Sequence, residues 1–106
     1  MIVKDEHVET ALTVIGNKRE AEAEWRARTQ EVELKRAEAR AYLGLKSGTV
    51  EDKKMAVRLA PEVMEREDSL LKLEYEWKLA KAEEKEANTI IEVYRTESAN
   101  NRRGTL

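Results

Sequence analysis

The chain has 106 residues, 40% of them charged, a formal net charge of −2 at pH 7, and neither cysteine nor phenylalanine. One domain at most fits this length, and so few large apolar residues exclude a sizeable core and a conventional enzyme pocket. The near-neutral charge excludes a strong general attraction to nucleic acid or to anionic membranes, and the lack of cysteine excludes disulfides and cysteine-based zinc sites. No apolar run approaches the length of a membrane span and the N-terminus lacks a signal-peptide layout, so we expect a cytoplasmic protein that does not bind membranes.

The first expected element is an N-terminal segment over residues 1–16, followed by a helix over residues 17–43. Gly16-Asn17 loosens the chain locally, but strong helix formers dominate from there on, so we expect one helix to continue to Leu43. Trp25 and Val32 resume the apolar stripe, which places Trp25 in the core. The apolar residues of the N-terminal segment recur at helical spacing; they are Val8, Ala11, Leu12 and Ile15.

A basic elbow over residues 44–49 is expected to end this helix, because Gly44 and Gly48 can adopt left-handed backbone conformations. Thr49, with Asp52 three residues later, predicts a capping box that opens a short helix over residues 50–60. The residue before a proline is disfavoured in a helix, so this helix ends at Ala60-Pro61.

Pro61 and the acidic residues after it suit the start of a long helix over residues 61–97, followed by a polar tail over residues 98–106. Apolar residues on the long helix follow alternating three- and four-residue steps, which is the pattern of a coiled-coil seam. We predict that this seam mediates self-association; its residues are Leu70, Leu73, Trp77, Ala80, Ala87, Ile91 and Tyr94. A second apolar row widens the face beyond what one partner helix would cover; it comprises Leu71, Leu79, Ala82, Ile90 and Val93. The predicted fold class is therefore all-α, a long helical hairpin with a short intervening helix that assembles through the seam.

Catalytic and cofactor sites are not predicted. His7 is the only histidine, and a solvated side chain is favoured over a metal ligand. The chain lacks the common nucleotide-binding, metalloprotease and nucleophile-elbow motifs, and its carboxylates alternate with cations as on exposed helix faces.

The strongest candidate site is the positive charge gathered around the elbow. Two interpretations stay open for these cations, namely an ordinary solvated helix face and a surface that approaches phosphates. Tyr42 has two open interpretations as well, stacking on a nucleotide base or capping the hairpin core. The candidate nucleic-acid-binding residues are Lys35, Arg36, Arg40, Tyr42, Lys46, Lys53 and Lys54.

The layout resembles the UvsY family, the phage recombination mediators that help load a RecA-like recombinase onto single-stranded DNA covered by a single-strand binding protein. The run Leu34-Lys35-Arg36-Ala37-Glu38-Ala39-Arg40-Ala41-Tyr42-Leu43 and the Gly/Ser turn after it are similar to that family's basic segment. A short helix, a break and a long helix with a seam follow. The run Ile90-Ile91-Glu92-Val93-Tyr94-Arg95-Thr96-Glu97-Ser98 and the Arg-containing end then resemble its amphipathic C-terminal region.

The resemblance, which covers roughly residues 35–103, implies DNA contacts by Lys35, Arg36 and Arg40, with Lys46, and a ring-like homo-oligomer. This chain departs from the family in its more compact elbow, its more acidic last helix and its small excess of positive charge. The expected function is that of a non-enzymatic, single-stranded DNA-binding recombination mediator. We expect it to be encoded by a phage, to act in the cytoplasm of the host cell and to need no cofactor. The alternative is a coiled-coil adaptor, including an inhibitor of a host-defence enzyme, that binds a protein partner and no nucleic acid.

Overall fold

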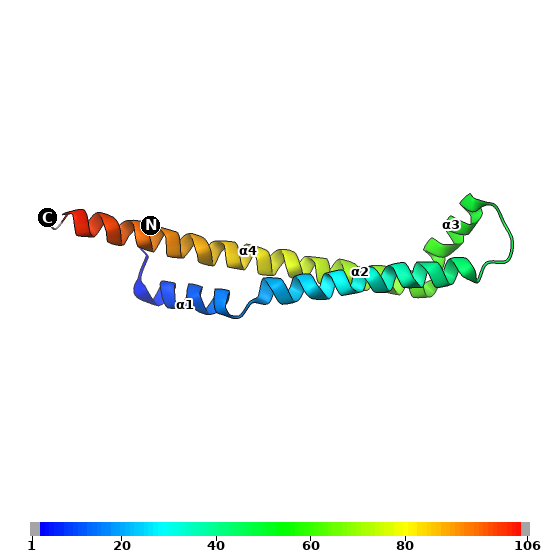
Figure 1. Ribbon diagram of the computed structural model, residues 1–106, viewed down its shortest axis with the longest axis horizontal. Coiled ribbons are helices and arrows are strands. Elements are labelled where there is room, and N and C mark those ends of the chain that lie inside the picture. The colour runs from blue at the N-terminus through cyan, green and yellow to red at the C-terminus, as the bar shows by residue number, and fades with distance from the viewer. Residues whose placement is uncertain (1–2, 105–106) are drawn as a thin grey trace. The chain divides into compact units, whose positions relative to one another are not determined.

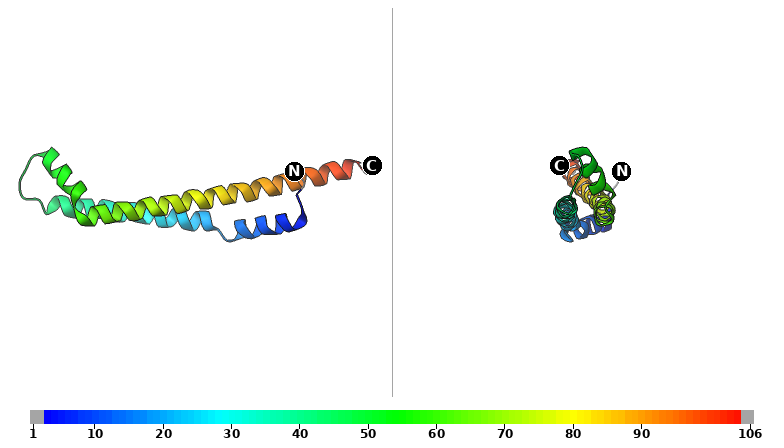
Figure 2. Two further views of the ribbon diagram at one scale, coloured as in Figure 1. Left: turned by 180° about the vertical axis from the view of Figure 1, so that it is seen from behind. Right: turned by 90° about the vertical axis from the view of Figure 1, so that its right-hand side faces the viewer.

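The computed structural model describes the backbone of residues 3–104 and the side chains of residues 3–102, and every regular element in this part of the chain is an α-helix. The helices are α1 (Asp5–Gly16), α2 (Arg19–Leu43), α3 (Val50–Leu59) and α4 (Pro61–Gly104) (Figures 1 and 2). Helix α3 lies between the long helices α2 and α4 in the chain. The predicted all-α class with a helical hairpin is confirmed.

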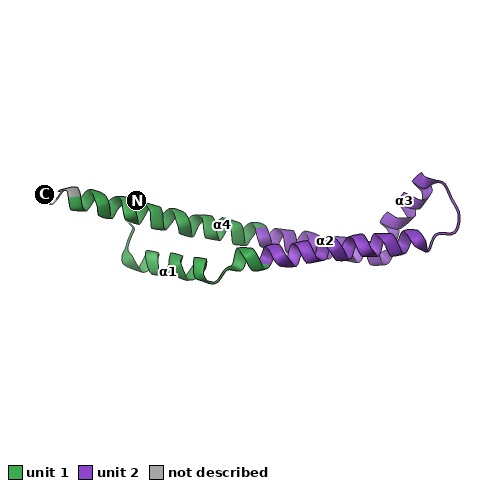
Figure 3. Ribbon diagram, in the orientation of Figure 1, with its two compact units in different colours: residues 1–22, 78–106 green, residues 23–77 purple. Residues whose placement is uncertain are grey.

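The chain divides into two compact units. Unit 1 consists of Met1–Glu22 and Lys78–Leu106, and unit 2 consists of Ala23–Trp77 (Figure 3). Each unit is formed by one section of α4 together with helical segments from earlier in the chain.

In unit 2, α2 packs on α4 through a row of small residues. Ala27 and Ala37 are fully buried, and Val63 on α4 is also buried. The row continues with alternating steps through half-buried positions at Ala23, Gln30, Leu34 and Ala41. Because alanine side chains are short, the backbones of the two helices can approach closely.

The two tryptophans of unit 2 lie in opposite environments, because the packed face of α2 is the one that carries Ala27 and Ala37. Trp25 is 68% exposed, so its predicted core position is wrong, whereas Trp77 on α4 is half-buried as predicted. Counting about 100° per residue, Trp25 falls on the side of α2 opposite Ala27 and Ala37. The guanidinium carbon of Arg28 lies 5.6 Å from the centroid of the Trp77 ring, a cation–π contact that covers part of it.

In unit 1, α1 lies beside its section of α4 (Figure 3). Val3 and Ala11 are buried, and so are Ala80 and Ala87 on this section of α4; Ala11 and Ala87 line one shallow groove between the two helices. The backbone N–H of Val3 donates to a carboxylate oxygen of Glu97 at 3.1 Å, which joins the start of the described chain to the far part of α4.

The chain breaks between α1 and α2, where the expected N-terminal segment over residues 1–16 meets the expected helix over residues 17–43; that helix spans Arg19–Leu43. Lys18 has a φ of 52°, a left-handed conformation that interrupts the helix. The N–H of Asn17 donates to the carbonyl of Thr13 and the N–H of Lys18 to that of Ile15, which ends α1. A loosening at Gly16-Asn17 was expected from the sequence, but the residue that changes conformation is a lysine.

The expected polar tail over residues 98–106 is also wrong within the described chain, since α4 continues to Gly104. Its half-buried positions continue through Tyr94 to Ser98 with the same helical steps, and Glu97 holds the N–H of Val3. These contacts stabilise helix beyond residue 97 despite its weak intrinsic preference. Residues 105 and 106 of the predicted tail lie outside the described residues.

The elbow forms largely as predicted. The Thr49 hydroxyl accepts a hydrogen bond from the N–H of Asp52 at 3.1 Å and caps α3. Ala60 is extended, with a ψ of 128°, and α4 begins at Pro61. Of the two glycines, Gly48 has a φ of 120° while Gly44 does not have a positive φ, so a single left-handed residue makes this turn.

Candidate nucleic-acid interface

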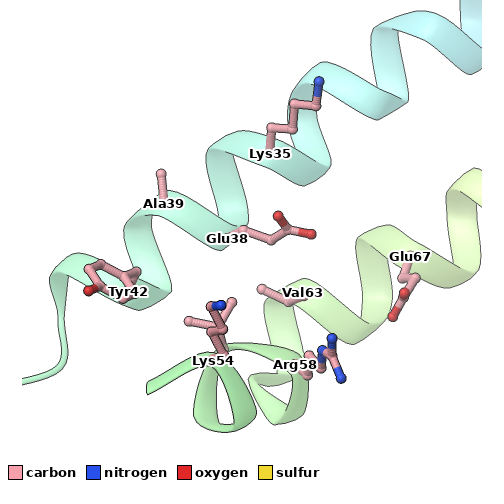
Figure 4. A pocket seen from close by; sticks show the side chains of 9 residues that line it. Lys35, Glu38, Ala39, Tyr42, Lys54, Arg58, Val63 and Glu67 are labelled. Atoms are coloured by element: carbon pink, nitrogen blue, oxygen red, sulfur yellow. The ribbon is translucent and has the colours of Figure 1, made fainter. Parts of the chain in front are cut away.

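The basic elbow borders an open groove of about 620 Å³ in unit 2, which we call the Tyr42 groove. Its walls come from three helices, so the groove exists only because α3 folds back toward α2 and the start of α4 (Figure 4). Tyr42 stands at the end of α2 and Val63 forms apolar floor from α4. The lining residues are Lys35, Glu38, Ala39, Tyr42, Lys54, Val57, Arg58, Val63 and Glu67.

Three cations line the groove without an ion pair to any described carboxylate. They are Lys35 from α2 and Lys54 and Arg58 from α3. Two carboxylates, Glu38 and Glu67, line it as well, so the local excess of positive charge is small. Such a surface can contact phosphates, but few of them in one chain.

Tyr42 combines an accessible ring with a neighbouring cation. Its residue surface is 42% exposed, and the Nζ atom of Lys53 lies 5.5 Å from the centroid of the ring. One part of the ring is therefore packed at the end of the hairpin while another part is open to solvent. Both interpretations from the sequence, stacking and capping, are compatible with this position.

The two arginines of the predicted site point to carboxylates instead of the groove. Arg36 pairs with Glu33 at 3.0 Å within α2, and Arg40 pairs with Glu62 on α4. Lys46 is exposed in the elbow and does not line the groove. The structure thus brings together Lys35, Tyr42, Lys53 and Lys54 from the predicted set, and separates Arg36, Arg40 and Lys46 from them.

Arg58 is the groove cation that the predicted site omitted. It follows Lys54 by four residues on α3, so both side chains lie on one face of that helix. This spacing was visible in the sequence. Its meaning depended on which face of α3 turns toward Tyr42, and only the packing of α3 specifies that face.

The predicted self-association residues are partly covered by the chain itself. All seven are buried or half-buried, in unit 2 against α2 and in unit 1 beside α1; they are Leu70, Leu73, Trp77, Ala80, Ala87, Ile91 and Tyr94. The second row splits, because Leu71, Leu79 and Ala82 are exposed while Ile90 and Val93 are half-buried. The seam therefore serves the packing of a single chain, and the uncovered apolar surface lies on other faces.

The described residues do not form a metal site, since they contain no group of three or more potential ligands placed to hold an ion. His7 is exposed, and its Nδ1 accepts a hydrogen bond from the N–H of Lys4 at 3.3 Å at the start of α1. Among the described helices, none is both long and apolar enough to span a bilayer.

Comparisons with protein-family models, with curated proteins and with solved structures find no match to this chain.

Proposed function

We propose that this chain is a non-enzymatic, single-stranded DNA-binding accessory protein of recombination that acts as a homo-oligomer. The observation that supports it most is the Tyr42 groove, where a part-exposed aromatic ring lies beside cations that have no carboxylate partner among the described residues. Aromatic platforms beside cations are the recurring means of binding single strands without sequence preference.

In this proposal the phosphates of the strand contact Lys35, Lys54 and Arg58, and one base stacks on Tyr42. Stacking of a base on an aromatic side chain contributes about 1–3 kcal/mol, and three phosphate contacts give a slope of log K against log salt of about −2 per chain. One groove binds weakly. Several grooves on one strand gain avidity, which is why the proposal includes an oligomer.

The assignment to recombination rests on the resemblance of the basic segment and the C-terminal region to the UvsY family. The partners that follow from it are a RecA-like recombinase and a single-strand binding protein. Lys35 and Tyr42 belong both to the resembling segment and to the groove.

Fluorescence anisotropy of a labelled single-stranded oligonucleotide over a salt series tests the DNA-binding step. The groove variant Lys35→Ala/Lys54→Ala/Arg58→Ala should lose most of the affinity and most of the salt dependence. A matched control, Lys81→Ala/Lys85→Ala/Arg95→Ala, removes the same charge from exposed positions of unit 1 and should bind nearly as well as the unmodified chain.

Two results would overturn the proposal. One is the absence of measurable binding at low salt, and the other is an equal loss of affinity in the groove variant and the control. A further variant, Tyr42→Leu, separates stacking from charge, because it should weaken binding while leaving the salt slope unchanged.

The adaptor function remains the second candidate because of the large apolar residues that are exposed on unit 2. Trp25 and Leu43 are the most exposed of them, and tryptophan is a frequent anchor in protein interfaces. An adaptor, including an inhibitor of a host-defence enzyme, would bind its partner through Trp25 and would show no affinity for oligonucleotides at any salt concentration.

A further inference from the structure

Two apolar stripes remain uncovered on unit 2. The α2 stripe consists of Trp25 and Val32, and the α4 stripe consists of Met64, Leu71 and Tyr75. All five residues are exposed, Leu71 by 60% and Tyr75 by 64%. Positions four or seven residues apart lie on one helix face, so the members of each set lie on the same side of their helix. Such exposed strips on a small helical chain indicate a binding surface.

The charges beside the two stripes have opposite sign. Three cations, Arg28, Lys35 and Arg36, flank the α2 stripe. Arg28 pairs with Glu24 and Arg36 with Glu33, so the cations exceed these carboxylates by one. Beside the α4 stripe three carboxylates outnumber two lysines; these residues are Glu67, Asp68, Glu74, Lys72 and Lys78.

This charge pattern decides which stripes can pair. Placing the α2 stripes of two copies together would bring their cations into contact, and placing two α4 stripes together would do the same for their carboxylates. Like charges across an interface cost free energy, whereas an α2 stripe against an α4 stripe brings opposite charges together. The favoured arrangement joins unlike surfaces.

The level of the residues agrees with this pairing. Within one chain α2 and α4 run antiparallel, and Arg40 near the end of α2 pairs with Glu62 near the start of α4. Residues earlier in α2 therefore lie at the same height as residues later in α4. Val32 stands eight residues before Arg40 on α2, and Leu70 stands eight residues after Glu62 on α4, next to Leu71. Two copies side by side in the same orientation would therefore bring Val32 level with Leu71, and Arg36 close to the level of Glu67.

We propose that the chain associates with itself head to tail, the α2 stripe of one copy packing on the α4 stripe of the next. The existing pairs of Arg28 with Glu24 at 2.9 Å and of Arg36 with Glu33 at 3.0 Å are exposed and within one helix, so they exchange readily. A repeated contact between unlike surfaces closes into a ring or continues as a filament.

This inference deepens the proposed function, because copies in one orientation present each Tyr42 groove on the same side. A single strand could then contact several grooves in succession. The seam on α4 is not needed for this contact, which leaves it to the packing of each chain.

Light scattering of the full chain over a concentration series, without DNA, tests the interface. The unmodified chain should show a mass several times the 12.2 kDa of one chain. Val32→Glu and Leu71→Lys should each weaken association by about tenfold or more, since each places an unpaired charge in the apolar strip. Both new side chains face opposite charges on their own helix, so circular dichroism should show unchanged helicity.

The double variant Val32→Glu/Leu71→Lys is decisive, because every head-to-tail contact would then pair a glutamate with a lysine. It should regain mass relative to both single variants, whereas an interface between like stripes would not recover. Leu12→Glu, at an exposed apolar position of unit 1, is the matched control and should leave the mass unchanged. A monomeric unmodified chain, full assembly by Val32→Glu, or no recovery in the double variant would each overturn the inference. Since no DNA is present, none of these results depends on whether the groove binds it.

Discussion

The two units use α4 in the same way but differ in what they leave uncovered. Among the described residues, ten of the twelve large apolar side chains that are exposed belong to unit 2, the exceptions being Leu12 and Leu79. Unit 2 also holds the three groove cations that have no ion pair within the described part of the chain. Unit 1 in contrast keeps most of its isoleucines and valines at least half-buried. The difference indicates that unit 1 mainly completes its own packing, whereas unit 2 offers surface to partners.

The reason for the contrast is the choice of small residues in the packed row of α2. Alanines bury little apolar area, so unit 2 obtains close helix contact without using its larger side chains. Those larger side chains then lie on outer faces, where they are available for association. In unit 1 the larger aliphatic residues of α1 and α4 are themselves in the packed faces.

The largest expected effect is on the free energy of unfolding, which should respond to loss of the half-buried Trp77 but not to loss of the exposed Trp25. Trp77→Ala should lower the free energy of unfolding by about 3 kcal/mol, because a large half-buried ring is lost from the seam. In dilute solution, where copies do not associate, Trp25→Ala should change it by less than about 0.5 kcal/mol. Urea unfolding followed by circular dichroism measures both. Equal losses would show that Trp25 is packed in the folded chain.

Trp77→Phe sharpens this comparison. The indole N–H of Trp77 is buried without a hydrogen-bond partner among the described residues, a state that costs about 1–3 kcal/mol. Phenylalanine keeps an aromatic ring and removes that donor, so its loss of stability should be well below that of alanine.

An intermediate effect is expected for overpacking of the alanine row. Ala37→Leu should destabilise the chain by about 1–3 kcal/mol, since no space is left at this fully buried position. Ala39→Leu, two residues away and exposed, is the matched control and should be nearly neutral. Thermal unfolding of the two variants compares them. A neutral Ala37→Leu would contradict the close approach of α2 to α4.

The smallest effect is expected in unit 1, where Arg19 pairs with Glu83 at 3.1 Å. Both side chains are about half exposed or more, so solvent and salt screen the pair. A double-mutant cycle with Arg19→Ala and Glu83→Ala should give a coupling of about 0.5 kcal/mol or less. A coupling well above 1 kcal/mol would show that exposed pairs hold unit 1 together.

Local signals in the sequence predicted the ends of α3 and the start of α4 correctly, because each depends on a few neighbouring residues. Thr49 caps α3 through the N–H of Asp52, and Pro61 excludes helix at Ala60. The face of α2 was predicted incorrectly for the opposite reason. Hydrophobicity ranks Trp25 above Ala27, yet the contact with α4 selected the smaller side chain.

In the candidate site too, the features set by neighbouring residues were predicted and those set by tertiary contacts were not. The sequence located the basic region and Tyr42, but it could not indicate that Arg40 pairs with Glu62 across the hairpin. Nor could it indicate that α3 turns Lys54 and Arg58 toward the groove. Both depend on residues far apart in the chain, and one sequence alone carries no information on their distance.

The sequence by itself determined that this protein is helical, where the elbow lies, and which residues of α4 form a continuous packed face. These properties follow from backbone preferences and from side-chain spacing along single helices. Tertiary structure alone decided that the seam is covered within the chain, that the tryptophans have opposite environments, and that three cations share one groove. These follow from how closely two helices approach, which depends on the side chains of both helices at each level.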